Sequence, residues 1–338
     1  MESEDHVGLL RRVLGDGGGA DLLDVLANRL SGADLTSLLL EVMRRRADRL
    51  GPADVLRQYR TDRFVSPAGT DIRDLRWVED AMFAALPEGF DVLTLAPVLP
   101  LGAHSALAAV DPRNVIATIR RTEVAADPTN GLALEAAARR RRMLDASPRS
   151  AEPVRLAASQ RVTRAQLFEG PISFAHFQLL GVVTAGRDTG NHEFERTHLI
   201  EHLRFAVDGI GAACARVGEI KIAITRLDEV ATGILGAVED EFTGVAGVQV
   251  ADAPERPSGR AYYRCLCFKV YVRFADTEAD TEADTEGAGA LSEPVEIGDG
   301  GFTDWTAKLL GNRKERLLIS GHGLDRLAIM SRRSPGHS

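Results

Sequence analysis

Hydrophobic residues recur at helical spacing over residues 20–60, with charged residues between them. Side chains three and four positions apart share one face of a helix, so this pattern predicts amphipathic helices. We therefore predict a helical N-terminal appendage over residues 1–68. The apolar stripes consist of Leu22, Leu23, Val25, Leu26 and Leu30, then Leu38, Leu39, Leu40, Val42 and Met43.

Beyond this appendage the pattern alternates between helices and strands. Helical spacing predicts helices over 72–86 and 193–217, and a third helix that follows a turn or cap at 127–131 and runs through Arg142. Runs rich in β-branched and aromatic residues predict strands over 91–97, 115–120, 153–167, 174–185, 221–226 and 262–274. Mainly antiparallel strands flanked by helices define an α+β class, which we assign to one domain over residues 69–332.

Two further segments have a polar composition. The sequence Ala-Asp-Thr-Glu occurs three times over 275–286 and offers almost no apolar surface, so we predict a disordered acidic insertion over 275–290. The second segment, 187–195, is dense in polar residues. It is either a mobile loop over a site or a turn that caps a helix.

Composition narrows the class of protein. The chain has 338 residues, 44% of them hydrophobic, which is enough for one large core with a small appendage. A net charge of −8 argues against a domain that binds nucleic acid through overall basicity. Cys214, Cys265 and Cys267 lack zinc-ligand spacing. With an acidic N-terminus and no apolar run near the length of about 18 residues that a membrane span needs, we predict a cytoplasmic protein without a membrane segment.

Two separated motifs carry the candidate chemistry. An arginine on a strand in 161–166 is followed by a loop and by an aromatic residue on the returning strand in 174–181. Small and hydrophobic residues in 319–330 surround the run Gly323-Leu-Asp-Arg326. In this order they resemble motifs 2 and 3 of class II aminoacyl-tRNA synthetases. The helix over 72–86 and the strand running to Pro97 resemble motif 1, which forms the dimer interface in that family, so the resemblance implies a homodimer.

The resemblance implies a site for ATP. Arg164 corresponds to the arginine on the α-phosphate, Arg326 to the arginine along the γ-phosphate, and Phe177 to the aromatic that stacks on adenine. Taken singly, Arg164 also fits a surface strand residue and Phe177 a core residue. Glu296 corresponds to a magnesium-binding acid, with Asp299 as the other candidate. A solvated turn would explain both acids equally well.

The resemblance narrows to the histidyl-tRNA synthetase branch. The run 258–270 is similar to the tyrosine signature of that branch, 300–304 to its glycine turn, and 127–129 to the segment that holds the substrate's amino group. The implied substrate-binding residues are Asp127, Thr129, Tyr262, Tyr263, Gly300 and Gly301.

The departures from this branch bear on the substrate. Residues that carry polar groups in the branch are replaced here by Ser258, Ala261, Leu179 and Val183. A buried imidazole needs hydrogen-bond partners for its nitrogens, so we expect this pocket not to select histidine. Gln166 and Ser173 also depart from motif 2. The candidates for replacement charge are His176, Arg187, Arg260 and Arg264.

Three functions follow from these patterns. The first is ATP-dependent activation of an amino acid or similar carboxylate, with transfer to tRNA, a protein or a small molecule. We expect no anticodon-binding domain after Met330. The second is a catalytically silent paralogue, like the one that regulates ATP phosphoribosyltransferase. The third is a pseudoenzyme that scaffolds a dimer. Retention of both Arg164 and Arg326 favours the first.

Overall fold

The computed structural model describes the greater part of the chain, and this part falls into two units. The first unit lies within Met1–Ser66 and Ala117–Thr122, and the second within Pro67–Ile116 and Glu123–Ser338. Nearly all of the acidic insertion predicted over 275–290 lies outside the described residues. The described residues are 22–166, 174–256, 260–275 and 293–331.

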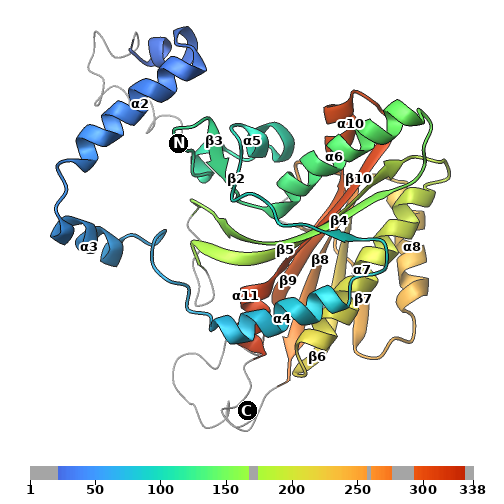
Figure 1. The fold of residues 1–338 in the computed structure, drawn as a ribbon. Coiled ribbons are helices and arrows are strands. Elements are labelled where there is room, and N and C mark those ends of the chain that lie inside the picture. The colour runs from blue at the N-terminus through green and yellow to red at the C-terminus, as the bar shows by residue number, and fades with distance from the viewer. Residues whose placement is uncertain (1–21, 167–173, 257–259, 276–292, 332–338) are drawn as a thin grey trace, which may run out of the picture. The chain divides into compact units, whose positions relative to one another are not determined.

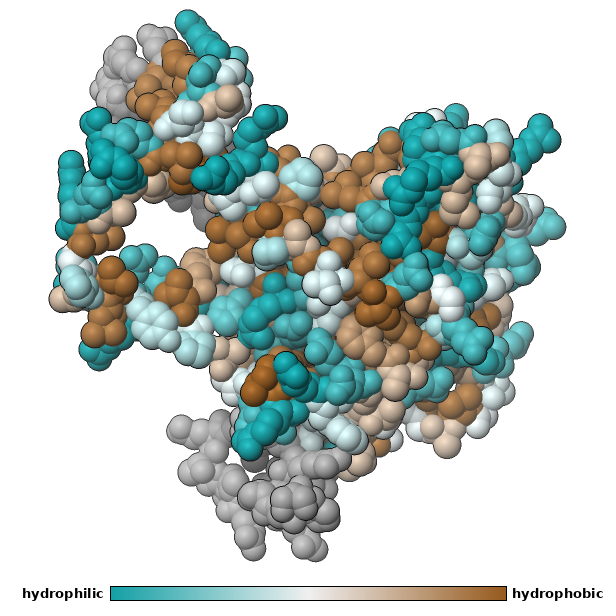
Figure 2. Space-filling view, viewed as in Figure 1, coloured by the Kyte–Doolittle hydropathy of each residue, from teal (hydrophilic) through white to brown (hydrophobic). Residues whose placement is uncertain are grey.

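The N-terminal unit is helical, as the sequence predicts. Its elements are η1 (Val25–Arg29), α2 (Gly32–Ala47) and α3 (Pro52–Thr61). Ser31 caps α2, because its hydroxyl accepts a hydrogen bond from the backbone N–H of Asp34 at 3.1 Å. None of the three helices contains a buried residue, so their apolar side chains lie at the surface of this unit (Figure 2).

In the described residues of the second unit, eight strands form one sheet. The inner strands pair antiparallel, whereas the outer pairs, β1 with β4 and β6 with β7, are parallel. The sheet thus confirms the predicted mainly antiparallel arrangement. In spatial order the strands are β1 (Asp91–Val92), β4 (Val154–Thr163), β5 (His176–Arg187), β10 (Glu315–Gly323), β9 (Val295–Thr303), β8 (Tyr263–Phe274), β6 (Val217–Arg226) and β7 (Val248–Asp252).

Helices cover both faces of this sheet (Figure 1). Successive side chains of a strand point to opposite faces, so Leu318 joins one hydrophobic core while its neighbours Leu317 and Ile319 join the other. The α+β class is confirmed, and no helix of the described part is long and apolar enough to cross a membrane. The first core packs against α4 (Ile72–Ala84), α7 (Glu193–Ala213), α8 (Ala231–Phe242) and α11 (Leu324–Met330). The second packs against α5 (Ala103–Ala108), α6 (Pro128–Ala146) and α10 (Trp305–Leu310).

One predicted strand, 115–120, is wrong. The chain instead turns back on itself there, with the backbone N–H of Thr118 donating to the carbonyl of Thr122 at 2.8 Å. The strand of this region is β3 (Thr122–Val124), which pairs with β2 (Val98–Pro100). The alternation of apolar residues therefore came from a tight turn. The sequence reading also assigned nothing to α8 and β7.

A fully buried ion pair connects α6 to the start of the central strand β10. Arg140 donates from Nε to Glu315 Oε2 at 2.8 Å and from Nη2 to Glu315 Oε1 at 3.0 Å, and neither side chain is exposed to solvent. Two further guanidinium hydrogens bind the carbonyls of Ser150 and Glu152 ahead of β4. Four of the five guanidinium donors and both carboxylate oxygens of this pair therefore have partners inside the protein.

We predict that Arg140→Met lowers the free energy of unfolding by about 3–5 kcal/mol, because it leaves the Glu315 carboxylate buried without its partner. Urea denaturation measures the change. Arg139→Met is the matched control on the same helix, since Arg139 pairs with Glu135 and Asp91 nearer the surface; it should cost about 1 kcal/mol or less. Equal effects of the two substitutions would contradict this prediction.

A buried histidine lies on the opposite side of β10. His322 is completely buried, and its ring meets that of Phe205 edge-on with centroids 5.4 Å apart. Neither ring nitrogen has a hydrogen-bond partner among the described residues. Burial lowers the pKa of His322 to about 4. Between that value and the ordinary pKa of about 6.5, the unfolded chain binds a proton here that the folded protein excludes.

This difference predicts an acid sensitivity with a defined sign. The contribution of the neutral His322 ring to the free energy of unfolding is complete above about pH 6.5 and is lost as the pH falls toward 4. We expect His322→Leu to reduce the loss of unfolding free energy between pH 7 and pH 4.5 by roughly 2–3 kcal/mol relative to the unsubstituted protein. Urea titrations at a series of pH values measure it. The exposed His192, changed to Asn, is the control, and an unchanged pH profile for His322→Leu would refute the assignment.

Candidate functional site

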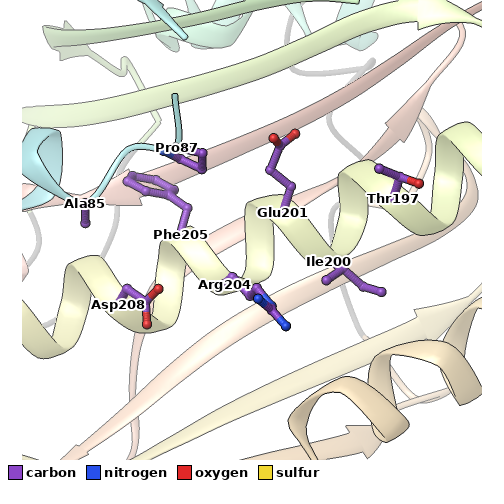
Figure 3. A pocket seen from close by; sticks show the side chains of 8 residues that line it. All are labelled: Ala85, Pro87, Thr197, Ile200, Glu201, Arg204, Phe205 and Asp208. Carbon is purple, nitrogen blue, oxygen red and sulfur yellow. The ribbon is translucent and has the colours of Figure 1, made fainter. Parts of the chain in front are cut away.

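Two hollows in the described part of the second unit lie on opposite faces of the sheet. One, of about 450 Å³, lies between the end of α4 and α7 (Figure 3). It is bordered by Glu201, which pairs with Arg155 at 3.3 Å, and none of the predicted site residues lines it. The other, of about 660 Å³, lies on the face that α6 covers and has a size typical of ligand sites. Eight of the ten predicted site residues line it: Asp127, Thr129, Arg164, Phe177, Tyr262, Tyr263, Glu296 and Arg326.

The first turn of α6 forms one wall of this larger cavity. Asp127 is the N-cap, and its Oδ1 accepts hydrogen bonds from the backbone N–H of Thr129 at 2.9 Å and from the Thr129 hydroxyl at 2.7 Å. Pro128 follows at the first helical position, where no N–H is needed. Because one carboxylate oxygen is used in capping, the other is available on the cavity side.

That second oxygen faces Arg164. Arg164 follows the last residue of β4, and the antiparallel register places Phe177 of β5 opposite Val162. The guanidinium carbon lies 5.1 Å from the centre of the Phe177 ring, its Nε donates to the carbonyl of Ala126 at 3.0 Å, and its Nη2 lies 3.2 Å from Asp127 Oδ2. The structure thus brings together the predicted phosphate, adenine and amino-group residues.

Arg326 and Glu296 line the same cavity from α11 and β9. Nη1 of Arg326 donates to the backbone carbonyl of Glu296 at 2.6 Å. The carboxylate of Glu296 binds the ammonium group of Lys269 at 2.6 Å. No group of three or more metal-ligating side chains occurs among the described residues. Lys269 holds one oxygen of the Glu296 carboxylate, and a role for Glu296 in binding Mg²⁺ stays a prediction.

The tyrosine pair at the start of β8 forms a third wall. Tyr263 donates its hydroxyl to Asp299 at 2.5 Å, and the ring of Tyr262 lies 5.7 Å from that of Trp305. Burial raises the pKa of Tyr262 to about 12 and that of Tyr263 well above its ordinary value. Burial also raises the pKa of Asp299, although nearby Arg256 and the Tyr263 hydroxyl oppose this. Both phenols therefore stay protonated at neutral pH, and that of Tyr263 donates to Asp299.

Sequence reasoning missed Arg256. This side chain is only 7% exposed, lines the cavity, donates to the carbonyl of Phe268 at 3.1 Å and forms an ion pair with Asp299. Arg260 and Arg264 do not line the cavity, although they were candidates for replacement charge. The signal in the sequence was an arginine shortly before the tyrosine pair. Both Arg256 and Arg260 meet this description, and their spacing from the tyrosines does not tell them apart.

Gly300 and Gly301 are the two predicted site residues that do not line the cavity. A Cβ on Gly300 would come within 2.4 Å of the Phe268 ring, and one on Gly301 within 2.8 Å of Cys267. Both contacts are shorter than real Cβ contacts, so these positions need glycine for packing of β9 against β8. A role in substrate binding for either glycine stays a prediction.

Comparison with solved structures gives the chain three informative neighbours, all at low sequence identity. An ATP phosphoribosyltransferase regulatory subunit/histidyl-tRNA synthetase from Bacillus halodurans C matches at a TM-score of 0.54 and 14% identity, over 80% of this chain and 83% of that one. The apo histidyl-tRNA synthetase of S. aureus matches at 0.53 and 13%, over 78% and 69%. A histidine–tRNA ligase subunit from Alicyclobacillus acidocaldarius matches at 0.50 and 12%, over 78% and 94%.

The chain has a class II aminoacyl-tRNA synthetase-like core. At these identities the likeness shows the fold, and it confirms the resemblance that motifs 2 and 3 carried. No protein-family model and no curated protein sequence matches the chain. The comparisons therefore assign no role to an individual residue, and the candidate roles rest on the geometry of the cavity.

Leu179, which replaces a polar residue of the histidyl branch, lines the cavity.

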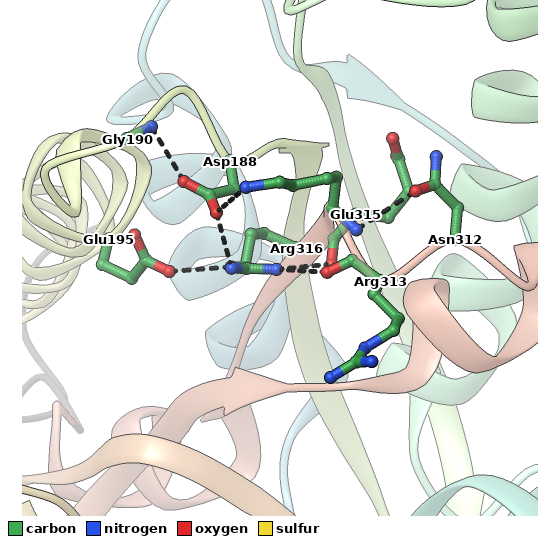
Figure 4. Close-up of polar contacts among 8 residues, drawn as sticks. Asp188, Gly190, Glu195, Asn312, Arg313, Glu315 and Arg316 are labelled. Carbon is green, nitrogen blue, oxygen red and sulfur yellow. Dashed lines mark hydrogen bonds and ion pairs between the residues drawn. The ribbon is translucent and has the colours of Figure 1, made fainter.

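The polar segment 187–195 forms the turn after β5. This turn is held by Asp188, which accepts from the N–H of Gly190 at 2.8 Å and pairs with Arg316 at 2.9 Å (Figure 4). Arg316 also binds Glu195 at 3.0 Å. The larger cavity is not lined by Asp188, Gly190, Glu195 or Arg316. The segment therefore fits a fixed turn ahead of α7 better than a mobile loop over the site.

Proposed function

We propose that this protein binds ATP in the larger cavity and activates an amino acid, or a similar carboxylate, as an adenylate. One observation carries the proposal: a single cavity of suitable size is lined by Arg164, Phe177 and Arg326, and the guanidinium of Arg164 lies over the ring of Phe177. The neighbours of this fold include histidyl-tRNA synthetases, which supports the same reading. The acceptor of the activated group is left open among tRNA, a protein and a small molecule.

Each residue has a defined part in this proposal. Phe177 offers a ring face for adenine. The carboxylate attacks the α-phosphorus of ATP, the bond between the α-phosphorus and the bridging oxygen to the β-phosphate breaks, and pyrophosphate leaves. Arg164 and Arg326 stabilise negative charge that grows at the phosphates in the transition state, and their hydrogen bonds to Ala126 and Glu296 carbonyls hold them in place beforehand. Glu296 would hold Mg²⁺ through its carboxylate, whose second oxygen is not used by Lys269, and Lys269 would bind a phosphate oxygen of ATP.

The ion pair between Asp127 and Arg164 favours a zwitterionic substrate. Both side chains are about one-third exposed, so the pair borders the cavity and is open to exchange. The ammonium group of an amino acid would replace Arg164 on Asp127, and this would release the guanidinium toward the carboxylate and phosphate. Thr129 keeps the Asp127 carboxylate oriented during the exchange.

A regulatory function is the second candidate, and the same pairing supports it. Three cations that line the cavity, Arg164, Arg256 and Lys269, each have an acid partner within it. Such a site binds a neutral zwitterion without any need for ATP. ATP–pyrophosphate exchange screened across the amino acids separates the two candidates. Exchange supports activation, whereas a thermal shift with an amino acid and none with ATP supports regulation.

For the enzyme we predict that Arg164→Ala and Arg326→Ala each lower the rate of ATP–pyrophosphate exchange by about 30- to 1000-fold. This corresponds to a loss of roughly 2–4 kcal/mol of transition-state stabilisation. Phe177→Ala should mainly raise the KM for ATP, because stacking acts on ground and transition states alike. Arg273→Ala, which removes a surface arginine from β8, is the control and should leave exchange unchanged. A full rate in Arg164→Ala would refute the assignment.

We also propose a homodimer through residues 72–100. Three large apolar side chains of this segment are at least half exposed: Ile72 and Trp77 on α4 and Val92 on the edge strand β1. Light scattering at micromolar concentration should give the mass of two chains, and Trp77→Lys should shift it toward one. Val245→Lys, at an exposed position outside the segment, should not. A monomer mass for the unsubstituted protein would contradict the proposal.

A further inference from the structure

His104 is a buried polar residue that the proposed chemistry does not use. It lies in the first turn of α5, is only 1% exposed and lines the wall of the larger cavity. A buried imidazole is costly unless both of its nitrogens have partners, and here both do. Nδ1 lies 2.5 Å from Glu123 Oε1, and Nε2 lies 3.0 Å from the backbone nitrogen of Ala126.

These two contacts define the protonation of the ring. A backbone N–H can only donate, so Nε2 must accept and carries no proton. Nδ1 therefore carries the proton and donates to Glu123. Glu123 is itself fixed, because its carboxylate also accepts from the backbone N–H of His104 at 2.8 Å and of Gly102 at 3.0 Å. The ring cannot rotate without breaking hydrogen bonds at both nitrogens.

Ala126 passes this constraint to the candidate site. Its N–H is held by His104, while its carbonyl accepts from Nε of Arg164 at 3.0 Å. The next residue is Asp127, which caps α6 and pairs with Nη2 of Arg164. A single peptide segment therefore connects the buried ring to both polar groups that the proposed function places on the substrate and on ATP.

We propose that His104 and Glu123 are positioning residues that fix the Ala126–Asp127 segment, and with it the orientation of Arg164 in the cavity. The assignment of Arg164 to ATP rests on the proposed function, whereas the constraint on the backbone does not. His104 does not touch the reacting atoms in this scheme. It acts by holding the N–H of Ala126, the residue whose carbonyl binds Arg164 Nε, and the remaining guanidinium nitrogens then point toward Asp127 and the cavity.

Two substitutions of similar size test this role. In His104→Gln the amide oxygen reaches about as far as Nε2 and can still accept from Ala126. In His104→Asn the shorter amide reaches only the position of Nδ1, so it keeps the contact with Glu123 and loses Ala126. Hydrogen exchange of the Ala126 amide in the full chain should become at least about tenfold faster in His104→Asn, since a hydrogen bond is lost. In His104→Gln it should stay near the unsubstituted rate. Equal exchange in both variants would overturn the proposal.

A second measurement separates positioning from a general loss of stability. The dissociation constant of ATP is measured by calorimetry and corrected for the fraction of folded protein. A substitution that only lowers stability leaves this corrected constant unchanged. His104→Asn should weaken ATP binding several-fold in the unsubstituted background and not at all in Arg164→Ala. The same weakening in both backgrounds would overturn the role toward Arg164. If the unsubstituted protein binds no ATP, the proposed function fails, and the exchange experiment alone decides whether His104 holds the segment.

Discussion

The buried ion pair of Arg140 with Glu315 is the constraint on which the cavity face of the fold depends. It ties α6 to β10, the strand that pairs with both β5 and β9. The first turn of α6 and the ends of these strands line the cavity, so the distance between its walls is fixed by this contact. An apolar pair would pack there as well, but only the bidentate geometry also captures the carbonyls before β4.

The candidate site shows a second kind of constraint, in which cationic and acidic side chains that line the cavity hold one another. Asp127 with Arg164, Lys269 with Glu296, and Arg256 with Asp299 come from different elements of the core. These pairs are partly open to the cavity, whereas Arg140 with Glu315 is closed. The protein thus separates charges that maintain the fold from charges that a ligand can reach.

Much of the site could be predicted because local rules place its residues. Arg164 and Phe177 meet through the register of a strand pair, and Asp127 stands where an N-cap is expected. The strand predicted over 115–120 was wrong because a turn can carry the same apolar alternation. Arg256 was missed because its role depends on a contact with Asp299, 43 residues away, and no local pattern encodes such a contact. The contacts that lead from His104 through Ala126 to Arg164 were missed for the same reason, because no local pattern encodes them.

The internal pairing of cations and acids in the cavity has a consequence for how affinity depends on ionic strength. A bare cluster of arginines attracts an anion through a field that dissolved salt screens over about 8–10 Å. Where a cation already has an acid beside it, as Arg164, Arg256 and Lys269 do, a ligand exchanges one short contact for another, and little net field from that pair reaches the solvent. Binding to such a cavity is selected by the arrangement of charges within the ligand, and it varies weakly with salt.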